Sequence, residues 1–410
     1  MTVLTETTAI KDIDAAHVEG RTVLVRADFN VPIADGVVTD TTRIDRGART
    51  IRELTARGAR VVVLSHFGRP KGAVRPELSL RPVLQPLQEA LGGASVRFAE
   101  SCVGEPAHEV TRQLKPGEVA LLENLRFHAG EESGDPEFAD ALAALGDVYV
   151  NDAFSVSHRA HASVAALAER LPAYAGRLMA AELTPLDAAL TAPDRPVMAI
   201  VGGAKVSTKL DLLGNLATKV DRLAIAGGMA NTFLAALGHD VGASKYEAEM
   251  LDTARAILRQ AQQAGCTVRL PSDGVAATAF EAGAATATVS VDEVPADHML
   301  LDVGSATAAT LEADLAACRT LVWNGPLGAF ETAPFDAGTN RVARSAARAV
   351  ETGMLRAVAG GGDTVAALTN AGVAERLSYV STAGGAFLEW LEGRTLPGVQ
   401  ALYAAAEPAV

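Results

Sequence analysis

Short apolar runs alternate with longer amphipathic stretches in the first part of the chain. The run Thr-Val-Leu-Val-Arg at 22–26 predicts a buried strand, and apolar residues then recur at helical spacing from Ile44 to Leu54, until Gly58. Further strands are predicted at 61–64, 119–122 and 148–150. Uninterrupted apolar strands separated by helices are typical of a parallel sheet that is covered on both faces.

The alternation weakens over residues 173–190, which we expect to be helical. Pro185 lies inside that helix, and the sequence leaves open whether it kinks the helix or splits it in two. It then resumes with predicted strands at 197–201, 223–226, 268–270, 299–303, 321–323 and 357–359. The sequence therefore predicts an α/β protein with two doubly wound parallel-sheet (Rossmann-like) domains, joined by a helix and separated by a cleft. We place the domains at 1–175 and 193–395 and the linking helix at 176–192.

Length and charge narrow the class of protein. A chain of 410 residues is longer than a domain with a single hydrophobic core usually is, so two domains are expected. The net charge of −13 argues against nucleic acid or an anionic membrane as the main partner. Three widely spaced cysteines predict reduced thiols, and we see neither a signal peptide in residues 1–12 nor a run of about 20 apolar residues. We expect a cytoplasmic protein.

Two glycine turns in the second half have the form of phosphate sites. Gly-Gly-Gly-Asp-Thr at 360–364 lies between an apolar run and a helical stretch, so its backbone N–H groups can face an anion while Asp363 holds a hard cation. Gly-Gly-Ala-Lys at 202–205 is the second turn, and we expect Lys205 and Lys209 to share one helical face near its N-terminus. The alternative is two solvated lysines. Neither a Walker A loop nor a dinucleotide-binding glycine motif is present.

Arginines follow the predicted strands of the first half. Arg43, Arg69, Arg126 and Arg159 would together bind a small, multiply charged anion, although a single arginine at such a place is more often a surface group. Histidines 158 and 161 are as well explained by structural hydrogen bonds. Asp28 and Asn30 either bind substrate hydroxyls or cap a turn, and the Phe29 side chain is expected to pack in the core.

Other strand ends in the second half offer less specific features. Gly227 and Gly228 would admit a flat base or allow tight helix–strand packing. Trp323 is expected in the core, and Gly304, Asn324 and Glu331 are further strand-end residues. Two phosphate turns in one half and arginines in the other indicate phosphoryl transfer.

Seven segments, in order along nearly the whole chain, resemble the phosphoglycerate kinase family. They are Val-Arg-Ala-Asp-Phe-Asn-Val-Pro, Ser-His-Phe-Gly-Arg-Pro, Glu-Asn-Leu-Arg-Phe-His, His-Arg-Ala-His-Ala-Ser, Gly-Gly-Ala-Lys-Val-Ser-Thr-Lys, Trp-Asn-Gly-Pro-Leu-Gly and Gly-Gly-Gly-Asp-Thr. The resemblance implies reversible phosphoryl transfer between 1,3-bisphosphoglycerate and ADP, giving 3-phosphoglycerate and ATP with Mg²⁺, in glycolysis and gluconeogenesis. It also implies a monomer with hinge-bending domains, and a tail, 396–410, that packs on the first, phosphoglycerate-binding domain.

The resemblance assigns roles residue by residue. It places phosphoglycerate binding on Asp28, Phe29, Asn30, Arg43, His66, Phe67, Gly68, Arg69, Arg126 and Arg159. It places nucleotide binding on Lys205, Lys209, Gly227, Gly228, Gly304, Asn324, Glu331, Gly361, Gly362, Asp363 and Thr364, with Mg²⁺ on Asp363. We assign charge cancellation on the transferred group to Arg43, Lys205, Mg²⁺ and the N-terminus of the helix after Gly362.

Some positions depart from the family pattern, and two other functions are consistent with the same residues. Phe67 replaces a common leucine, Thr208 stands where relatives often have aspartate, and residues 401–410 match weakly. A kinase for a different small carboxylate, or a binding protein without turnover, would show many of the same residues.

Overall fold

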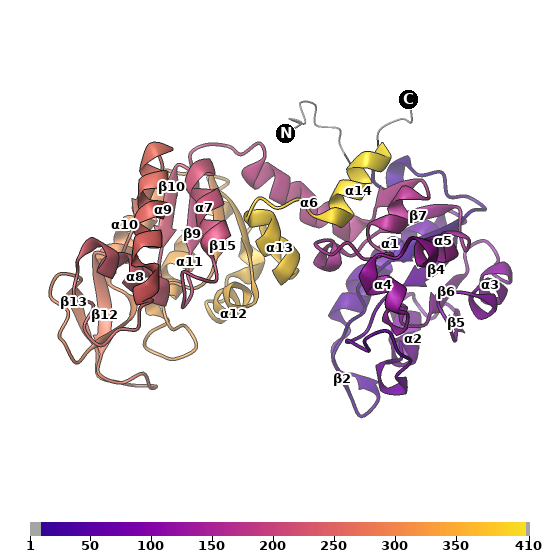
Figure 1. Ribbon diagram of the computed structural model, residues 1–410, viewed down its shortest axis with the longest axis horizontal. Helices are drawn as coiled ribbons and strands as arrows, with labels where there is room; N and C mark the ends of the chain where they lie inside the picture. Colours follow the sequence, from indigo (N-terminus) through magenta and orange to yellow (C-terminus); the bar gives the residue numbers. More distant parts are fainter. Residues whose placement is uncertain (1–9, 407–410) are drawn as a thin grey trace. The chain divides into compact units, whose positions relative to one another are not determined.

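The structure is a computed structural model that describes residues 10–406. It divides into a first unit, residues 10–183 with 395–406, and a second unit, Thr184–Arg394. Figure 1 shows both units, coloured along the chain. The predictions made for residues 1–9 and for the last four residues of the tail lie outside the described residues.

A six-stranded parallel sheet forms the centre of the first unit. Its order is β5 (Val96–Ala99), β6 (Val119–Leu122), β4 (Arg60–Leu64), β1 (Thr22–Arg26), β7 (Val148–Asn151) and β8 (Ala173–Ala175). A hairpin of β2 (Ile33–Ala34) and β3 (Val37–Val38) lies outside this sheet. The strands are apolar because both faces are covered, as the sequence pattern predicts.

Helices supply the rest of the first core. They are α1 (Thr42–Ala56), α2 (Leu84–Ala90), α3 (Glu105–Arg112), α4 (Ala129–Ser133), α5 (Pro136–Ala143) and α14 (Pro397–Ala406). Ile44, Ile51 and Leu54 of α1 are fully buried against the sheet, which confirms the helical spacing seen in the sequence. The C-terminal helix α14, yellow in Figure 1, lies against the first unit, and Gly398 N donates to Ser157 O at 2.9 Å.

The second unit repeats the architecture. Its parallel sheet has the order β11 (Thr267–Arg269), β10 (Arg222–Ile225), β9 (Val197–Val201), β15 (Thr320–Asn324), β16 (Arg356–Gly360) and β17 (Tyr379–Ser381). Its helices are α7 (Leu210–Lys219), α8 (Gly228–Leu237), α9 (Leu251–Gln263), α10 (Ser305–Ala316), α11 (Ala337–Glu351), α12 (Gly362–Asn370) and α13 (Gly384–Leu391). Trp323 is in the core of this unit, as expected, and is 1% exposed.

Two predicted elements differ from the structure. Residues 299–303 do form a strand, β14 (Met299–Val303), but it pairs antiparallel with β12 (Asp273–Ala277) in a three-stranded sheet that also contains β13 (Ala287–Ser290). Residues 173–175 form β8 rather than the start of a helix, because they pair with β7. Apolar runs of this length do not distinguish sheet partner or element type.

Helix α6 (Arg177–Leu190) continues through Pro185 as one element, so of the two alternatives left open by the sequence the split into two helices is excluded. Its first turn is fixed to the first unit. Buried Asp152 accepts hydrogen bonds from Leu178 N at 2.7 Å and Met179 N at 3.2 Å. Arg177 donates to Asp12 at 3.0 Å and to Glu53 at 2.9 Å. The hydrogen bonds to the Asp152 side chain and the ion-pair network together anchor the start of α6.

The anchor gives a prediction about pH. Burial raises the pKa of Asp152 from its ordinary value of 3.8 to about 7. Between about pH 4 and 7 the unfolded chain has therefore released a proton that the folded chain keeps, so this carboxyl lowers stability as pH rises. We expect Asp152→Asn, which keeps an acceptor oxygen, to gain stability relative to the wild type by up to about 1.4 kcal/mol per pH unit over this range.

Urea unfolding of both proteins between pH 4 and 8 measures this difference. Asp252→Asn, at a site exposed to solvent, is the control. A difference between Asp152→Asn and the wild type that stays constant with pH would contradict the prediction.

Candidate active site

Each parallel sheet has a point where successive connections run in opposite directions. In the first unit this point is at β1, which has β4 on one side and β7 on the other. In the second unit it lies between β9 and β15. Ligands of open α/β sheets bind beyond the carboxyl ends of the strands at such points, and the predicted site residues follow these strands.

Five basic side chains in the first unit form what we call the basic cluster: Arg26, His66, Arg126, Arg159 and His161. Arg26 and Arg126 are buried, at 0% and 4% exposure, as are both histidines. Burial, followed by the charges of nearby arginines, holds the pKa of His66 well below its usual range and lowers that of His161 to about 3. Both rings are therefore neutral near pH 7, and the charge of the cluster comes from arginine.

Several donors of the basic cluster have no acceptor. The buried Nε atoms of Arg126 and Arg159 make no hydrogen bond to any part of the chain between residues 10 and 406, although Arg126 Nε lies 3.4 Å from Glu132 Oε1. Buried donors in folded proteins are almost always satisfied. Unsatisfied guanidinium groups in a cluster of positive charge are what a site for a multiply charged anion requires.

Asn30 and Gly68 connect the strand ends around this cluster. Asn30 Oδ1 accepts from Gly68 N at 2.9 Å, and Gly68 O accepts from Arg126 Nη1 at 2.7 Å. Gly68 has φ +59°, and a Cβ there would lie 2.8 Å from Leu78 Cδ2, so only glycine fits. The loops after β1, β4 and β6 are thus held together through one glycine backbone.

Asp28 and Arg43 form an ion pair at the edge of the site. Arg43 Nη1 donates to Asp28 Oδ2 at 2.8 Å, and Ser155 Oγ donates to the same oxygen at 2.5 Å. Asp28 Oδ1 accepts from Asn30 N at 3.1 Å, which is the turn that the sequence left as an alternative. Arg43 is about half exposed, so its remaining donors can reach a ligand.

The structure brings some of the predicted first-unit residues together and separates others. The Phe29 side chain is fully buried, 2.9 Å from where a Cβ on Gly47 would lie, which agrees with the core packing expected from the sequence, and its assignment to phosphoglycerate binding stays a prediction. Phe67 packs partly against the core. Arg69 is exposed, and we find no hydrogen bond or ion pair from it to the described residues.

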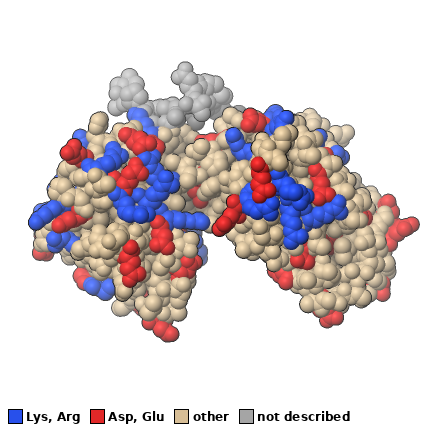
Figure 2. Space-filling model, turned by 180° about the vertical axis from the view of Figure 1, so that it is seen from behind, with Lys and Arg blue, Asp and Glu red and all other residues tan. Residues whose placement is uncertain are grey.

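Sequence reasoning gave no role to Arg26, Glu131 or Ser163, although all three are fully buried beside the predicted residues. Arg26 did carry a signal, because a charged residue ended a strand that was otherwise apolar. On the face seen in Figure 2, Lys and Arg are interleaved with Asp and Glu in both units. The interior cluster differs from that surface because its arginines have few carboxylate partners.

A cavity of about 340 Å³ lies in the second unit at the ends of β9, β15 and β16. It brings together residues from both predicted phosphate turns, with Leu388 of α13 as a lining residue that the sequence did not indicate. The lining includes Gly202, Gly203, Ala204, Lys205, Thr208, Lys209, Asn324, Gly325, Pro326, Gly361, Gly362, Asp363, Thr364 and Leu388.

The N-terminus of α12 opens into this cavity. The first hydrogen bond within the helix runs from Val365 N to Gly361 O. The N–H groups before Val365 therefore have no acceptor inside the helix. Gly361, at φ +101°, and exposed Gly362 and Asp363 form that turn. Helix α10 is different, because Asp273 already accepts from Ala306 N and Thr307 N at its N-terminus. Helix α12 therefore offers its dipole and N–H groups to an anion.

Lys205 and Lys209 both line the cavity, but they do not share a helical face. Helix α7 begins only at Leu210, so that expectation is wrong. The segment before Leu210 is a turn instead, in which Val206 is buried and Lys209 N donates to Val206 O. Lys209 Nζ donates to Gly202 O and to Asn324 Oδ1, both at 2.6 Å, and thereby ties the ends of β9 and β15 together.

Other predicted nucleotide residues lie outside this lining. Gly227 packs on the Gly203 backbone, where a Cβ would lie 2.8 Å from Gly203 O, which supports the tight-packing alternative for this glycine. Gly304 faces the Asp273 carboxylate at the start of α10. Glu331 is exposed.

Asn324 and Thr364, which do line the cavity, hold its wall together. Thr364 Oγ1 accepts from Gly325 N at 2.7 Å, and Asn324 Nδ2 donates to Gly360 O at 2.8 Å.

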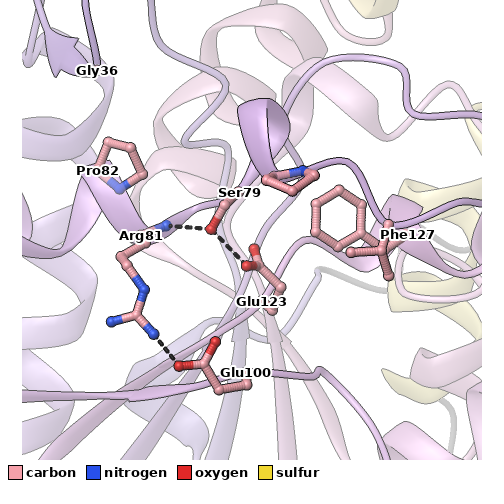
Figure 3. A pocket seen from close by; sticks show the side chains of 9 residues that line it. Gly36, Ser79, Arg81, Pro82, Glu100, Glu123 and Phe127 are labelled. Carbon is pink, nitrogen blue, oxygen red and sulfur yellow. Dashed lines mark hydrogen bonds and ion pairs between the residues drawn. The ribbon is translucent and has the colours of Figure 1, made fainter.

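A larger cavity, of about 610 Å³, lies in the first unit (Figure 3). Its polar side chains bind one another. Ser79 Oγ donates to Glu123 Oε2 at 2.6 Å, and Arg81 pairs with Glu100. Because Arg81 is paired with Glu100 and Glu123 adds a further negative charge, this cavity suits a phosphate less well than the basic cluster does.

The described residues contain no group of three or more His, Cys, Asp or Glu side chains that could hold a metal. This does not conflict with Mg²⁺, which is commonly bound by one or two carboxylates together with substrate phosphates. Exposed Asp363 lies beside the open N-terminus of α12, so its carboxylate fits that arrangement.

The chain was compared with known proteins. The sequence profile described as "Phosphoglycerate kinase" matches residues 10–394. Curated proteins named phosphoglycerate kinase are 60% identical over 95% of this chain and 98% of the relative in Methylorubrum extorquens (strain PA1), and 59% identical over 96% and 99% in Rhodospirillum centenum.

Solved structures agree. Phosphoglycerate kinase from Coxiella burnetii superposes with a TM-score of 0.91 at 38% identity, over 97% of this chain and all of that one. The enzyme from Pyrococcus horikoshii OT3 gives 0.75 at 29% identity, over 96% and 99%.

Two parallel α/β units, together with the match to kinases over nearly the whole chain, define a phosphotransferase that uses ATP and ADP. The chain belongs to the phosphoglycerate kinase family. Its acceptor is a carboxyl group, and its pathway is glycolysis.

The Lys209 environment predicts proton uptake on nucleotide binding. Burial lowers the pKa of Lys209 from 10.5 to about 8, only partly offset by the charge of Asp363. An anion in the cavity favours the ammonium form, so at pH 8 binding of ADP should take up about half a proton more than in Lys209→Arg, whose charge is permanent.

Calorimetry of ADP binding to the full chain, in two buffers of different ionisation enthalpy, gives this number. Equal proton uptake by the wild type and Lys209→Arg would show that Lys209 is already charged in the free protein.

Proposed function

We propose that the first unit binds 3-phosphoglycerate or 1,3-bisphosphoglycerate and the second binds ADP or ATP, and that the phosphoryl group passes reversibly between them. The observation that carries this proposal is the set of unsatisfied buried guanidinium donors in the first unit. The open N-terminus of α12 in the second unit supports it. In this proposal the domain assigned at 1–175 binds phosphoglycerate and the domain assigned at 193–395 binds the nucleotide.

In the first unit, arginine supplies the charge for the acid. Arg126 and Arg159 have free buried donors, and Arg43 and Arg69 are exposed at the same strand ends. We assign the doubly charged phosphate and the carboxyl group of phosphoglycerate to these four guanidinium groups and to the Nε2 side of His66. Asp28, Asn30 and Gly68 hold the strand ends in place and offer polar atoms to the substrate hydroxyl.

In the second unit, the phosphates of the nucleotide fit the cavity at the N-terminus of α12. The N–H groups around Gly362, with Lys205 and Lys209, would neutralise the β- and γ-phosphates. Asp363 would hold Mg²⁺, which supplies further positive charge at the phosphates. Gly227, Gly228, Gly304 and Glu331 stay predictions for the rest of the nucleotide.

The chemistry needs no general base. In the direction that consumes ATP the nucleophile is a carboxylate, which is ionised at pH 7. His66 and His161 are neutral and buried, which agrees with a binding role rather than proton transfer. Catalysis then depends on alignment and on cancelling charge, and we assign that to Arg43, Lys205 and the N-terminus of α12.

We further propose a cytoplasmic monomer whose main partners are these small molecules. None of the helices within residues 10–406 combines the length and apolar character that crossing a membrane requires.

Removal of either assigned cation should slow turnover. We expect Arg43→Ala and Lys205→Ala each to lower kcat by about 10²–10³, the usual loss for one preorganised donor to a transition state. A coupled assay of ATP formation measures this. Arg49→Ala on the same helix α1 and Lys219→Ala at the end of α7 are matched controls, since both side chains are exposed. Near-normal rates for Arg43→Ala and Lys205→Ala would exclude the assignment.

Binding on separate units requires that both ligands be brought into line. The sequence predicts a cleft with hinge-bending domains, and such closure would also exclude water. We expect small-angle scattering to show a smaller radius of gyration when 3-phosphoglycerate and a nonhydrolysable MgATP analogue are both present than with either alone. Unchanged dimensions in the ternary complex would count against closure.

A further inference from the structure

Four fully buried side chains in the first unit form one continuous chain of hydrogen bonds. Ser163 Oγ donates to Glu131 Oε1 at 2.6 Å and accepts from Arg26 Nε at 2.8 Å. Arg26 Nη2 lies 3.2 Å from His66 Nδ1. Glu131, Ser163 and Arg26 are 0% exposed and His66 is 3% exposed. We call this set the Glu131 relay.

Further hydrogen bonds hold Glu131, Ser163 and Arg26 of the relay in place. Ser163 N donates to Glu131 Oε2 at 3.0 Å, and Ser163 O accepts from Tyr149 Oη at 2.7 Å. Arg26 Nη1 donates to Ala27 O at 2.5 Å. The guanidinium plane therefore has a contact at each of its three nitrogens, which leaves it one orientation.

That orientation decides which nitrogen of His66 carries the proton. A guanidinium group can only donate, so His66 Nδ1 must accept. A second proton on the ring would point directly at a cation, and the ring is also desolvated, so the neutral form is favoured. The remaining proton is on Nε2, which is the one donor that His66 can offer to a ligand.

We propose that Glu131, Ser163 and Arg26 are positioning residues that hold His66 as a neutral Nε2–H donor for the phosphoglycerate substrate. The inference rests on the proposed function, because it takes the basic cluster as the acid site. Glu131 also places a buried negative charge beside Arg26 and 3.7 Å from His161 Nδ1, which offsets part of the repulsion among the arginines.

The first measurement uses the wild-type full chain without ligand. Nitrogen-15 NMR of histidine-labelled protein distinguishes the two neutral tautomers and the charged ring, and His66→Gln identifies the His66 signals among the eight histidines. We expect the Nε2–H tautomer from pH 6 to 8. An Nδ1–H or charged His66 would overturn the proposal without any further variant.

The second measurement breaks the relay at its smallest member. Ser163→Ala removes the hydroxyl that joins Glu131 to Arg26. We expect a mixture of His66 tautomers and a rise of about tenfold in KM for 3-phosphoglycerate, with a smaller change in kcat, since one oriented donor is lost. Ser163→Thr keeps a hydroxyl and should restore the wild-type tautomer. A wild-type tautomer and KM in Ser163→Ala would overturn the relay.

Ser244→Ala is the matched control, because Ser244 is a buried serine of the second unit whose Oγ accepts from Leu300 N at 2.8 Å. It should lose a similar amount of stability and leave His66 unchanged. Addition of 3-phosphoglycerate separates the two proposals. If His66 has the expected tautomer but its signals do not respond to the acid, the relay stands and the placement of the acid site fails.

Discussion

Positive charge held together in the interior of the first unit is the constraint on which the site depends. Arg26 and Arg126 are buried and Arg159 has a buried Nε, so they repel one another in a medium that screens poorly. Glu131 compensates at most one of these charges, and Glu132, whose Oε1 lies 3.4 Å from Arg126 Nε, partly compensates another. The unit tolerates the remainder because the strand ends are cross-linked through Gly68, Asn30 and Ser163. A bound anion removes the repulsion, so the same feature that costs stability supplies affinity.

In the second unit the candidate anion site is formed mainly by backbone groups rather than by side chains. A Cβ on Gly202 would lie 1.8 Å from Pro326 O, and one on Gly325, at φ +101°, would lie 2.2 Å from Gly202 O. The ends of β9 and β15 therefore pack backbone against backbone at the switch point of the sheet. This close packing lets Lys209 bridge both strands, and the cavity forms between them and the N-terminus of α12.

The sequence predicted the fold class and most strand positions because buried parallel strands leave a strong apolar signal. It also predicted phosphate turns after β9 and β16, and the structure brings these turns together because parallel strands end at one edge. It could not place Met299–Val303 in a separate sheet, because strand partner is not a local property. Glu131 and Ser163 were missed for a similar reason. Neither residue stands out in the sequence, because its role depends on partners that are distant along the chain. Ser163, for example, binds Arg26, which is 137 positions away.

The two units also respond differently to pH, and this follows from the choice of cation. Arginine does not titrate, and the histidines of the basic cluster are held neutral, so the charge offered to the acid is constant near pH 7. The cavity of the second unit contains a lysine whose pKa is about 8. Arginine therefore suits the permanently buried site, whereas Lys209 would gain its full charge on binding the phosphates that we propose for the more open cavity. A substrate carboxylate that is itself ionised means that no protein group needs to take a proton from the nucleophile, and the proton uptake expected at Lys209 belongs to nucleotide binding.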